Sequence, residues 1–419
     1  MIATTINLNN AATERCVASP QAVVQKILML YLLVWSISPP LEIDWIYRII
    51  AIICAGLWFA LAGHRHLALL KIHHRAIGFA VAVALIVLID TLQPAKIFRP
   101  IAIYMLVIAF IMNHFYQGHW QELSGFVPIM LLLLLFYNYQ TVTALSLDHT
   151  IARRIVRNDP MIYPYLRRGV GGYSLIYPQV CIFPALAIWI YTAWSHKRLY
   201  FALGCAWLLS YVMFCLQAGY STVIFVSVLG MIIFFFHKRQ SLTAAVIVSL
   251  GVFLASLLAI YYLDGLREFL LKVFEGTAVS RKIYDLTQIE SDQLGLLQGS
   301  SSLEVRIVRY MGSIKTMLRF PIIGSLWFGG AGGHSALLDT FAVYGLWGGL
   351  LYAKMLLKVP VFMKEHYQHP LIQSLAKATF ITIFFVALLN SNTYSFMFFL
   401  LILLPLIFHD IMRWRNITA

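Results

Sequence analysis

Two arginines and a histidine, separated by a glycine-rich stretch, are the residues of this chain best suited to chemistry. Arg306 and Arg309 lie one helical turn apart, and planar guanidinium groups bind phosphate oxygens through paired hydrogen bonds. His334 follows directly after the glycine-rich residues 329–333. Its imidazole titrates near neutral pH, so it can accept a proton from an attacking hydroxyl. The pattern predicts a site for an anionic substrate; a histidine that only anchors a helix end at a membrane interface is the simpler alternative.

A second group of arginines lies in a separate hydrophilic segment, residues 141–173. This segment holds five arginines against two aspartates, which leaves a net charge of +3, and Arg167 and Arg168 lie near its end. Contact with anionic lipid headgroups is one explanation for such a charge beside a membrane. A phosphate-bearing substrate is the more specific explanation, because guanidinium groups fit phosphate oxygens.

The composition indicates that membrane-spanning helices position these residues. Of the 419 residues 61% are hydrophobic and 11% are charged, and the mean hydropathy is +0.80. A water-soluble fold of this size needs far more charge to cover its surface. Basic residues accumulate in the cytoplasmic loops of membrane proteins, so the net charge of +14 does not imply nucleic-acid binding. The five cysteines show no metal-ligand spacing.

The sequence predicts an all-α polytopic membrane protein with about twelve transmembrane helices. A helix needs about 20 apolar residues to cross a bilayer. Segments of this kind are expected near 23–40, 46–63, 76–93, 98–114, 124–140, 174–194, 199–217, 219–236, 243–263, 336–357, 371–390 and 393–411.

Lysines and arginines in the short loops predict the orientation of these helices. With the N-terminus inside, the basic residues of the cytoplasmic loops are Arg65, Lys71, Arg75, Lys197, Arg198, Lys238, Arg239, Lys358, Lys364, Arg413 and Arg415. The short loops on the other side, at 39–44, 217–219 and 390–392, have no lysine or arginine. Both termini are therefore expected to face the cytoplasm, and two long loops to lie outside.

The expected organisation follows from these assignments. It runs from a cytoplasmic tail (1–22) through N-terminal transmembrane helices (23–140), a basic external loop (141–173), central transmembrane helices (174–263), a large external loop (264–335) and C-terminal transmembrane helices (336–411) to a second cytoplasmic tail (412–419).

The large external loop is expected to contain at least two amphipathic helices. One covers 264–275, where apolar residues line a single stripe and Arg267 lies beside them. The other begins at the capping box Ser301-x-x-Glu304 and ends before Pro321. The loop has few apolar residues for an independent core, so it is expected to pack on the membrane bundle as a lid.

These motifs resemble those of bacterial O-antigen polymerases of the Wzy type and of the related O-antigen ligases. His334-Ser335, nine residues and Gly345 fit the histidine motif of the ligase family. Three further stretches are similar to family motifs: Arg306-x-x-Arg309-Tyr310, the PIIG of 321–324, and Arg168-Gly169 with GGYSLIY after it. Gly345 is followed by Leu-Trp-Gly-Gly, whereas many ligases continue with Gly-x-x-Thr-Thr, and this difference favours the polymerases.

The resemblance implies a glycosyltransferase of the bacterial inner membrane whose active site faces the periplasm. It would transfer a growing glycan from undecaprenyl diphosphate onto a hydroxyl of a lipid-linked repeat unit. His334 would activate that hydroxyl, and the diphosphate would be bound by Arg168, Arg306 and Arg309, with Arg167 and Arg267 as weaker candidates. Tyr310, Ser335 and Asp339 would support these residues.

The same resemblance implies no cofactor and no metal. Its partners would be the undecaprenyl-diphosphate-linked oligosaccharide, membrane lipid and a chain-length regulator protein. Glu42 and Asp44 have the spacing to share a divalent cation with a diphosphate. An acidic pair that is simply tolerated outside the membrane is the simpler interpretation.

Two other functions stay open at the level of sequence. An O-antigen ligase would use the same donor and residues, but would transfer the glycan to the lipid A core. A transporter or flippase without catalysis would place charged residues or broken helices near the membrane midplane. The polar residues of this chain lie mostly in the two long external loops instead, which favours catalysis.

Overall fold

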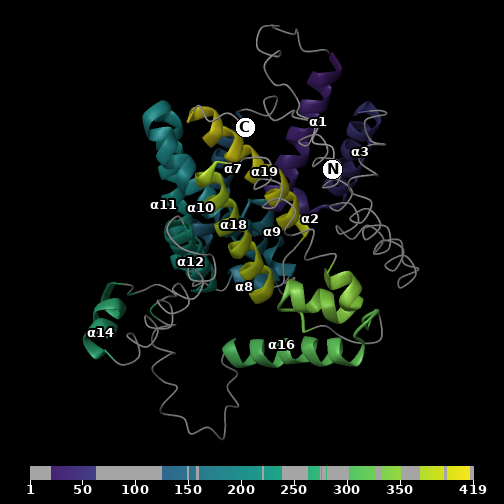
Figure 1. Cartoon of the computed structure of the whole chain (residues 1–419), viewed down its shortest axis with the longest axis vertical. Helices are drawn as coiled ribbons and strands as arrows, with labels where there is room; N and C mark the ends of the chain where they lie inside the picture. Colours follow the sequence, from purple (N-terminus) through teal and green to yellow (C-terminus); the bar gives the residue numbers. More distant parts are fainter. Residues whose placement is uncertain are drawn as a thin grey trace, which may run out of the picture.

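The regular structure of this protein is helical. The computed structural model describes residues 20–62, 125–148, 151–156, 160–218, 221–237, 263–273, 275, 280, 302–325, 332–350, 369–390 and 394–415. Within these ranges there are helices and no strands, which confirms the all-α class predicted from the sequence (Figure 1).

The described helices run in this order along the chain. They are α1 (Pro20–Ile37), α2 (Pro39–Ile43), α3 (Trp45–Ala62), α7 (Phe126–Leu147), α8 (Ile151–Val156), the 3₁₀ turn η3 (Pro160–Ile162), α9 (Tyr163–Arg167), α10 (Tyr173–His196), α11 (Arg198–Ala218), α12 (Ser221–His237), α14 (Asp264–Val273), α16 (Ser302–Arg319), α18 (Pro370–Leu389) and α19 (Tyr394–Trp414). One more helix, Ala336–Leu350, precedes α18.

In the described part of the chain, four helices are long and apolar enough to cross a membrane. They are Phe126–Leu147, Leu175–His196, Arg198–Ala218 and Pro370–Leu389. Shorter apolar helices cover Val23–Ile37, Trp45–Trp58, Val223–Phe235 and Ala336–Leu350. The predicted spans at 76–93 and 98–114, and nearly all of the one at 243–263, lie outside the described residues.

Helix α10 is the centre of the bundle. It packs against α11, α12, α18 and α19, and it is the most buried of the four long apolar helices. Two prolines, Pro178 and Pro184, lie inside it. Such prolines are tolerated in membrane helices because neighbouring groups satisfy the freed backbone carbonyls.

A buried polar contact connects three of the bundle helices. Asn138 of α7 and Gln179 of α10 exchange hydrogen bonds of 2.9 Å, and the indole N–H of Trp207 in α11 also donates to Gln179, at 2.9 Å. In an apolar environment each of these groups would be costly if unpaired. The contact therefore fixes how α7 and α11 are rotated against α10.

Helix α16 lies across one end of the bundle rather than along it (Figure 1). Its bounds, Ser302–Arg319, agree with the helix predicted between Ser301 and Pro321, and α14 agrees with the helix predicted over 264–275. The loop expected at 39–44 is instead the short helix α2, because the two prolines at its start are already set for helical geometry. Helix α7 continues to Leu147, past the predicted end at 140.

Candidate functional site

Asp339 holds the loop that carries His334. Its carboxylate accepts hydrogen bonds from the backbone N–H of Gly333 (3.3 Å) and of Ser335 (3.2 Å), which flank the histidine. It also accepts a 2.6 Å bond from the hydroxyl of Ser313 in α16. Hydrogen bonds to a charged acceptor are roughly twice as strong as neutral ones. The backbone on both sides of His334 is therefore fixed by one carboxylate.

The glycine before this loop brings it into contact with α16. The backbone N–H of Gly332 donates to the Ser313 hydroxyl oxygen at 2.8 Å. A Cβ atom on Gly332 would overlap the carbonyl oxygen of Arg309, so only glycine fits at this distance from the helix. Arg309 is exposed, and its backbone lies directly against the His334 loop.

Ser335 begins the helix Ala336–Leu350 and joins it to α18. Its hydroxyl oxygen accepts a bond from Leu338 N–H (3.1 Å), as an N-cap does, and its hydroxyl donates to Ala387 O (3.3 Å). The next backbone N–H, of Ala336, donates to Asn390 O at 2.8 Å. His334 is thus held half-buried at the C-terminal end of α18.

The same end of α18 anchors α16 and α10. The Tyr310 hydroxyl of α16 donates to Leu389 O at 2.7 Å, and the Tyr177 hydroxyl of α10 donates to the side-chain oxygen of Asn390, also at 2.7 Å. Both bonds lie beside the Ala336–Asn390 contact. The start of α10, the end of α18, α16 and the His334 loop therefore form one connected site.

Two glycines of the predicted motifs, Gly324 and Gly345, lie against each other where the loop after α16 meets the helix after His334. Gly324 (φ +81°) and Gly345 (φ +67°) both have the left-handed backbone that favours glycine. A Cβ on Gly345 would overlap Ile322 O, and one on Gly324 would overlap Val343 O. At this point Ser325 N–H donates to Ala342 O (2.9 Å) and Leu346 N–H donates to Pro321 O (2.7 Å). The loop after α16 is thereby bonded to the helix after His334.

The basic segment of the first long loop leads into this end of the bundle. Arg167 ends α9 and Arg168 is its C-cap, and both side chains are exposed. The next residue, Gly169 (φ +90°), packs so closely on the Tyr137 ring that a Cβ would overlap it. Arg168 lies only five residues before the start of α10, and Tyr177 is in the second turn of α10. Arg168 and His334 therefore lie at the same end of the bundle.

The remaining predicted arginines are placed differently. Arg267 forms a 2.6 Å ion pair with Asp264 of its own helix, α14. That helix stands to one side of the bundle, well away from α16 and from the helix that follows His334 (Figure 1). The structure therefore does not bring Arg267 to the site. The backbone of Arg306 belongs to α16, one turn before Arg309, but its side chain lies outside the described residues.

Sequence reasoning missed Ser313 and Asn390, and it gave no role to Tyr177, the last residue of the GGYSLIY stretch, although all three connect the site. Ser313 is four residues after Arg309, and so lies beside it on α16, while Asn390 is the C-cap of α18. A polar residue at the end of an apolar helix was the available signal for Asn390. Asp44, of the predicted acidic pair, is the C-cap of α2, and the side chain of Glu42 lies outside the described residues. Within the described part of the chain no three His, Cys, Asp or Glu side chains are placed to hold a metal ion.

The site offers one imidazole on a backbone that is held by hydrogen bonds, and exposed guanidinium groups lie at the same end of the apolar bundle. Comparison with protein-family models and with curated proteins found no match for this sequence.

Proposed function

We propose that this protein is a polysaccharide polymerase of the bacterial inner membrane, with the active site at the periplasmic end of the bundle. It transfers a growing glycan from undecaprenyl diphosphate onto a hydroxyl of a lipid-linked repeat unit. The observation that carries this proposal is the connection between Arg309, Ser313 and Asp339. Through it, a guanidinium-bearing helix and a histidine loop are held against one another above an apolar bundle.

The proposed reaction needs a base and a site for a departing anion. The imidazole of His334 takes the proton of the acceptor hydroxyl while the hydroxyl oxygen bonds to the anomeric carbon of the donor. The bond from that carbon to the diphosphate oxygen breaks, and undecaprenyl diphosphate leaves with the electron pair. Negative charge grows on the leaving oxygen, and guanidinium groups placed there lower the barrier.

The positions of the arginines support this division of roles. Arg309 is exposed on α16 beside the His334 loop, and Arg168 and Arg167 are exposed at the same end of the bundle. Arg306 shares α16 with Arg309. Arg267 is paired with Asp264 on a helix that stands apart, so it has the weakest support as a ligand of the diphosphate.

Asp339, Ser313 and Ser335 act as positioning residues in this proposal. They hold the backbone around His334 and do not need to touch the substrate. Tyr310 acts in the same way, because its hydroxyl fastens α16 to the end of α18. A catalytic base on a fixed backbone stays in the geometry that the reaction needs, whereas a base on a free loop is often out of place, and the rate is then lower.

A reconstituted reaction with a single substrate tests this function. The purified protein in proteoliposomes receives lipid-linked repeat units and no lipid A core. A polymerase converts these units into a ladder of longer lipid-linked chains, seen by gel or mass spectrometry. Unchanged repeat units would contradict polymerase activity; product formed only when lipid A core is added would identify a ligase. Movement of intact repeat units across the membrane would identify a transporter.

A further inference from the structure

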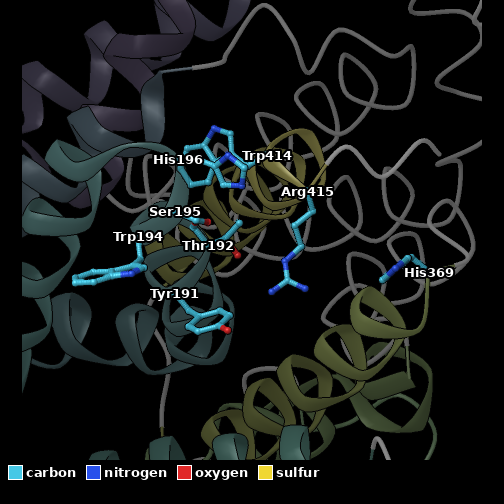
Figure 2. Close-up of a pocket in the computed structure, with 8 residues that line it drawn as sticks. All are labelled: Tyr191, Thr192, Trp194, Ser195, His196, His369, Trp414 and Arg415. Atoms are coloured by element: carbon cyan, nitrogen blue, oxygen red, sulfur yellow. The ribbon is translucent and has the colours of Figure 1, made fainter.

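A cleft at the opposite end of α10 takes no part in the proposed reaction. It has a volume of about 580 Å³ and is lined by Tyr191, Thr192, Trp194, Ser195, His196, His369, Trp414 and Arg415. These residues come from the last turns of α10, the start of α18 and the end of α19 (Figure 2). From Tyr177 to His196, α10 rises roughly 30 Å, which is about the thickness of a bilayer's hydrocarbon core.

Arg415 is the main positive charge in this cleft. Figure 2 shows its guanidinium group pointing into the space between Tyr191 and His369. The guanidinium carbon lies 5.9 Å from the centre of the Tyr191 ring, a cation–π arrangement that steadies the side chain. No carboxylate in the described part of the chain pairs with Arg415. Asp410, a buried acid of α19, accepts a hydrogen bond from Trp189 and has Arg413 and Lys197 as its charged neighbours.

His369 offers a second donor from across the cleft. Its Nδ1 accepts a 3.2 Å bond from Leu371 N–H and so caps the N-terminus of α18. Because Nδ1 is the acceptor, Nε2 is the nitrogen that carries the proton. The first turn of α18 also presents the positive end of its helix dipole at this point, which favours a bound anion.

The hydroxyl groups of Thr192 and Ser195 in the cleft are already used within α10. Thr192 donates to Ile188 O (2.8 Å), and Ser195 donates to Thr192 O (3.1 Å). The nitrogens of Arg415, His369 and His196 are available to a ligand, and the Tyr191 hydroxyl and the indole N–H groups of Trp194 and Trp414 are further donors among the lining side chains. A ligand that suits a guanidinium group surrounded by further donors, and supplies only acceptors itself, is a phosphate or phosphate ester.

The rim of the cleft indicates a lipid rather than a free ion. Tyr191 and Trp194 are 68% and 66% exposed, although both are large and aromatic. Amphipathic aromatic side chains gather at the membrane–water interface, at the depth of the lipid headgroups. The helix dipole is enough to explain basic residues at helix C-termini. It does not explain a cleft that has an aromatic rim and receives donors from three helices.

We propose that this cleft binds the phosphodiester headgroup of an anionic phospholipid, in the leaflet opposite to the candidate catalytic site. Arg415 and His369 hold the phosphate, and Tyr191 and Trp194 lie beside the glycerol and the upper acyl chains. In the orientation predicted from the loop charges, this is the cytoplasmic leaflet. Basic pockets between helices on this side of a membrane are typical binding sites for anionic lipids.

Native mass spectrometry of the full-length protein tests this site. The protein is titrated with phosphatidylglycerol, with phosphatidylcholine and with inorganic phosphate. We expect phosphatidylglycerol to bind in preference to phosphatidylcholine, and Arg415→Gln to weaken that binding about tenfold, since a charge-assisted hydrogen bond is lost. Arg198→Gln is the matched control, because Arg198 is exposed at the same end of the bundle but does not line the cleft.

A second variant keeps the test decisive if Arg415→Gln does not fold. His369→Asn retains a side-chain acceptor for the N-cap of α18 and removes the ring nitrogen that faces the ligand. We expect weaker phosphatidylglycerol binding from it as well. Binding by these variants as tight as that of Arg198→Gln would overturn the site. Inorganic phosphate that displaces phosphatidylglycerol at millimolar concentration would overturn the choice of a lipid.

Discussion

The hydroxyl of Ser313 donates a 2.6 Å hydrogen bond to the carboxylate of Asp339. Ser313 lies on α16, the helix that crosses the end of the bundle. Asp339 lies 26 positions later in the chain, shortly after His334. Both are partly or fully buried, so the bond is shielded from water. This bond holds the helix of Arg309 against the loop of His334. The proposed reaction requires these two residues to act on the same substrate.

Replacing Gly332 with alanine should separate these two elements. The added Cβ would overlap Arg309 O, and relief of that overlap should cost about 1–3 kcal/mol. Polymer formation should fall by at least tenfold, with faster proteolysis around α16. Gly312→Ala is the matched control: its Cβ meets nothing within 4 Å, and alanine should stabilise α16 by about 0.5–1 kcal/mol. Equal activity of the two variants would show that this close contact is unimportant.

Asp339→Asn should weaken the loop without removing any residue that touches substrate. Both carboxylate oxygens accept bonds, so the amide nitrogen of asparagine would face a donor and leave it unpaired, at a cost of about 1–3 kcal/mol. We expect a lower unfolding temperature and a lower kcat with little change in KM. Glu268→Gln, an exposed acid on α14, should change neither. A larger change in KM than in kcat would indicate that Asp339 binds substrate directly.

Arg309→Gln and Arg168→Gln should each raise KM for the lipid-linked donor and lower kcat. A guanidinium group that stabilises the leaving diphosphate contributes in both the ground state and the transition state, and we expect about a tenfold loss of kcat/KM or more. Lysine at either position should restore activity only in part, because it cannot bind two oxygens in a fork. Arg319→Gln, also exposed on α16, should retain more than half of the activity. Equal losses for all three variants would point to a general electrostatic effect.

Chelation of divalent ions should leave polymer formation unchanged, because guanidinium groups are expected to neutralise the diphosphate. The double variant Glu42→Gln, Asp44→Asn should likewise retain activity. The measurement is the rate of chain growth with and without EDTA. If activity disappears with the chelator and returns with magnesium or manganese, the acidic pair holds a catalytic metal.

The helices of this site were predictable from local signals, but their contacts were not. The capping box at Ser301 and the proline at 321 gave the bounds of α16, since both act within a few residues. The contact of Gly324 with Gly345 joins two motifs. Their separation along the chain did not predict that they lie next to each other in space. The bond from Tyr177 to Asn390 spans 213 positions, and only the packing of α10 on α18 brings these residues together. Side-chain pairing across helices depends on their rotation, which periodicity does not specify.

The account depends most directly on His334, and the chain length of the product made by His334→Ala measures its role. Purified variant and wild-type protein receive the same lipid-linked repeat units in proteoliposomes, after both are shown to unfold at the same temperature. Loss of a positioned base lowers such rates roughly 10²- to 10⁴-fold, so we predict that the variant leaves the repeat units single while still binding them. Long chains made by the variant at the wild-type rate would contradict the proposed mechanism.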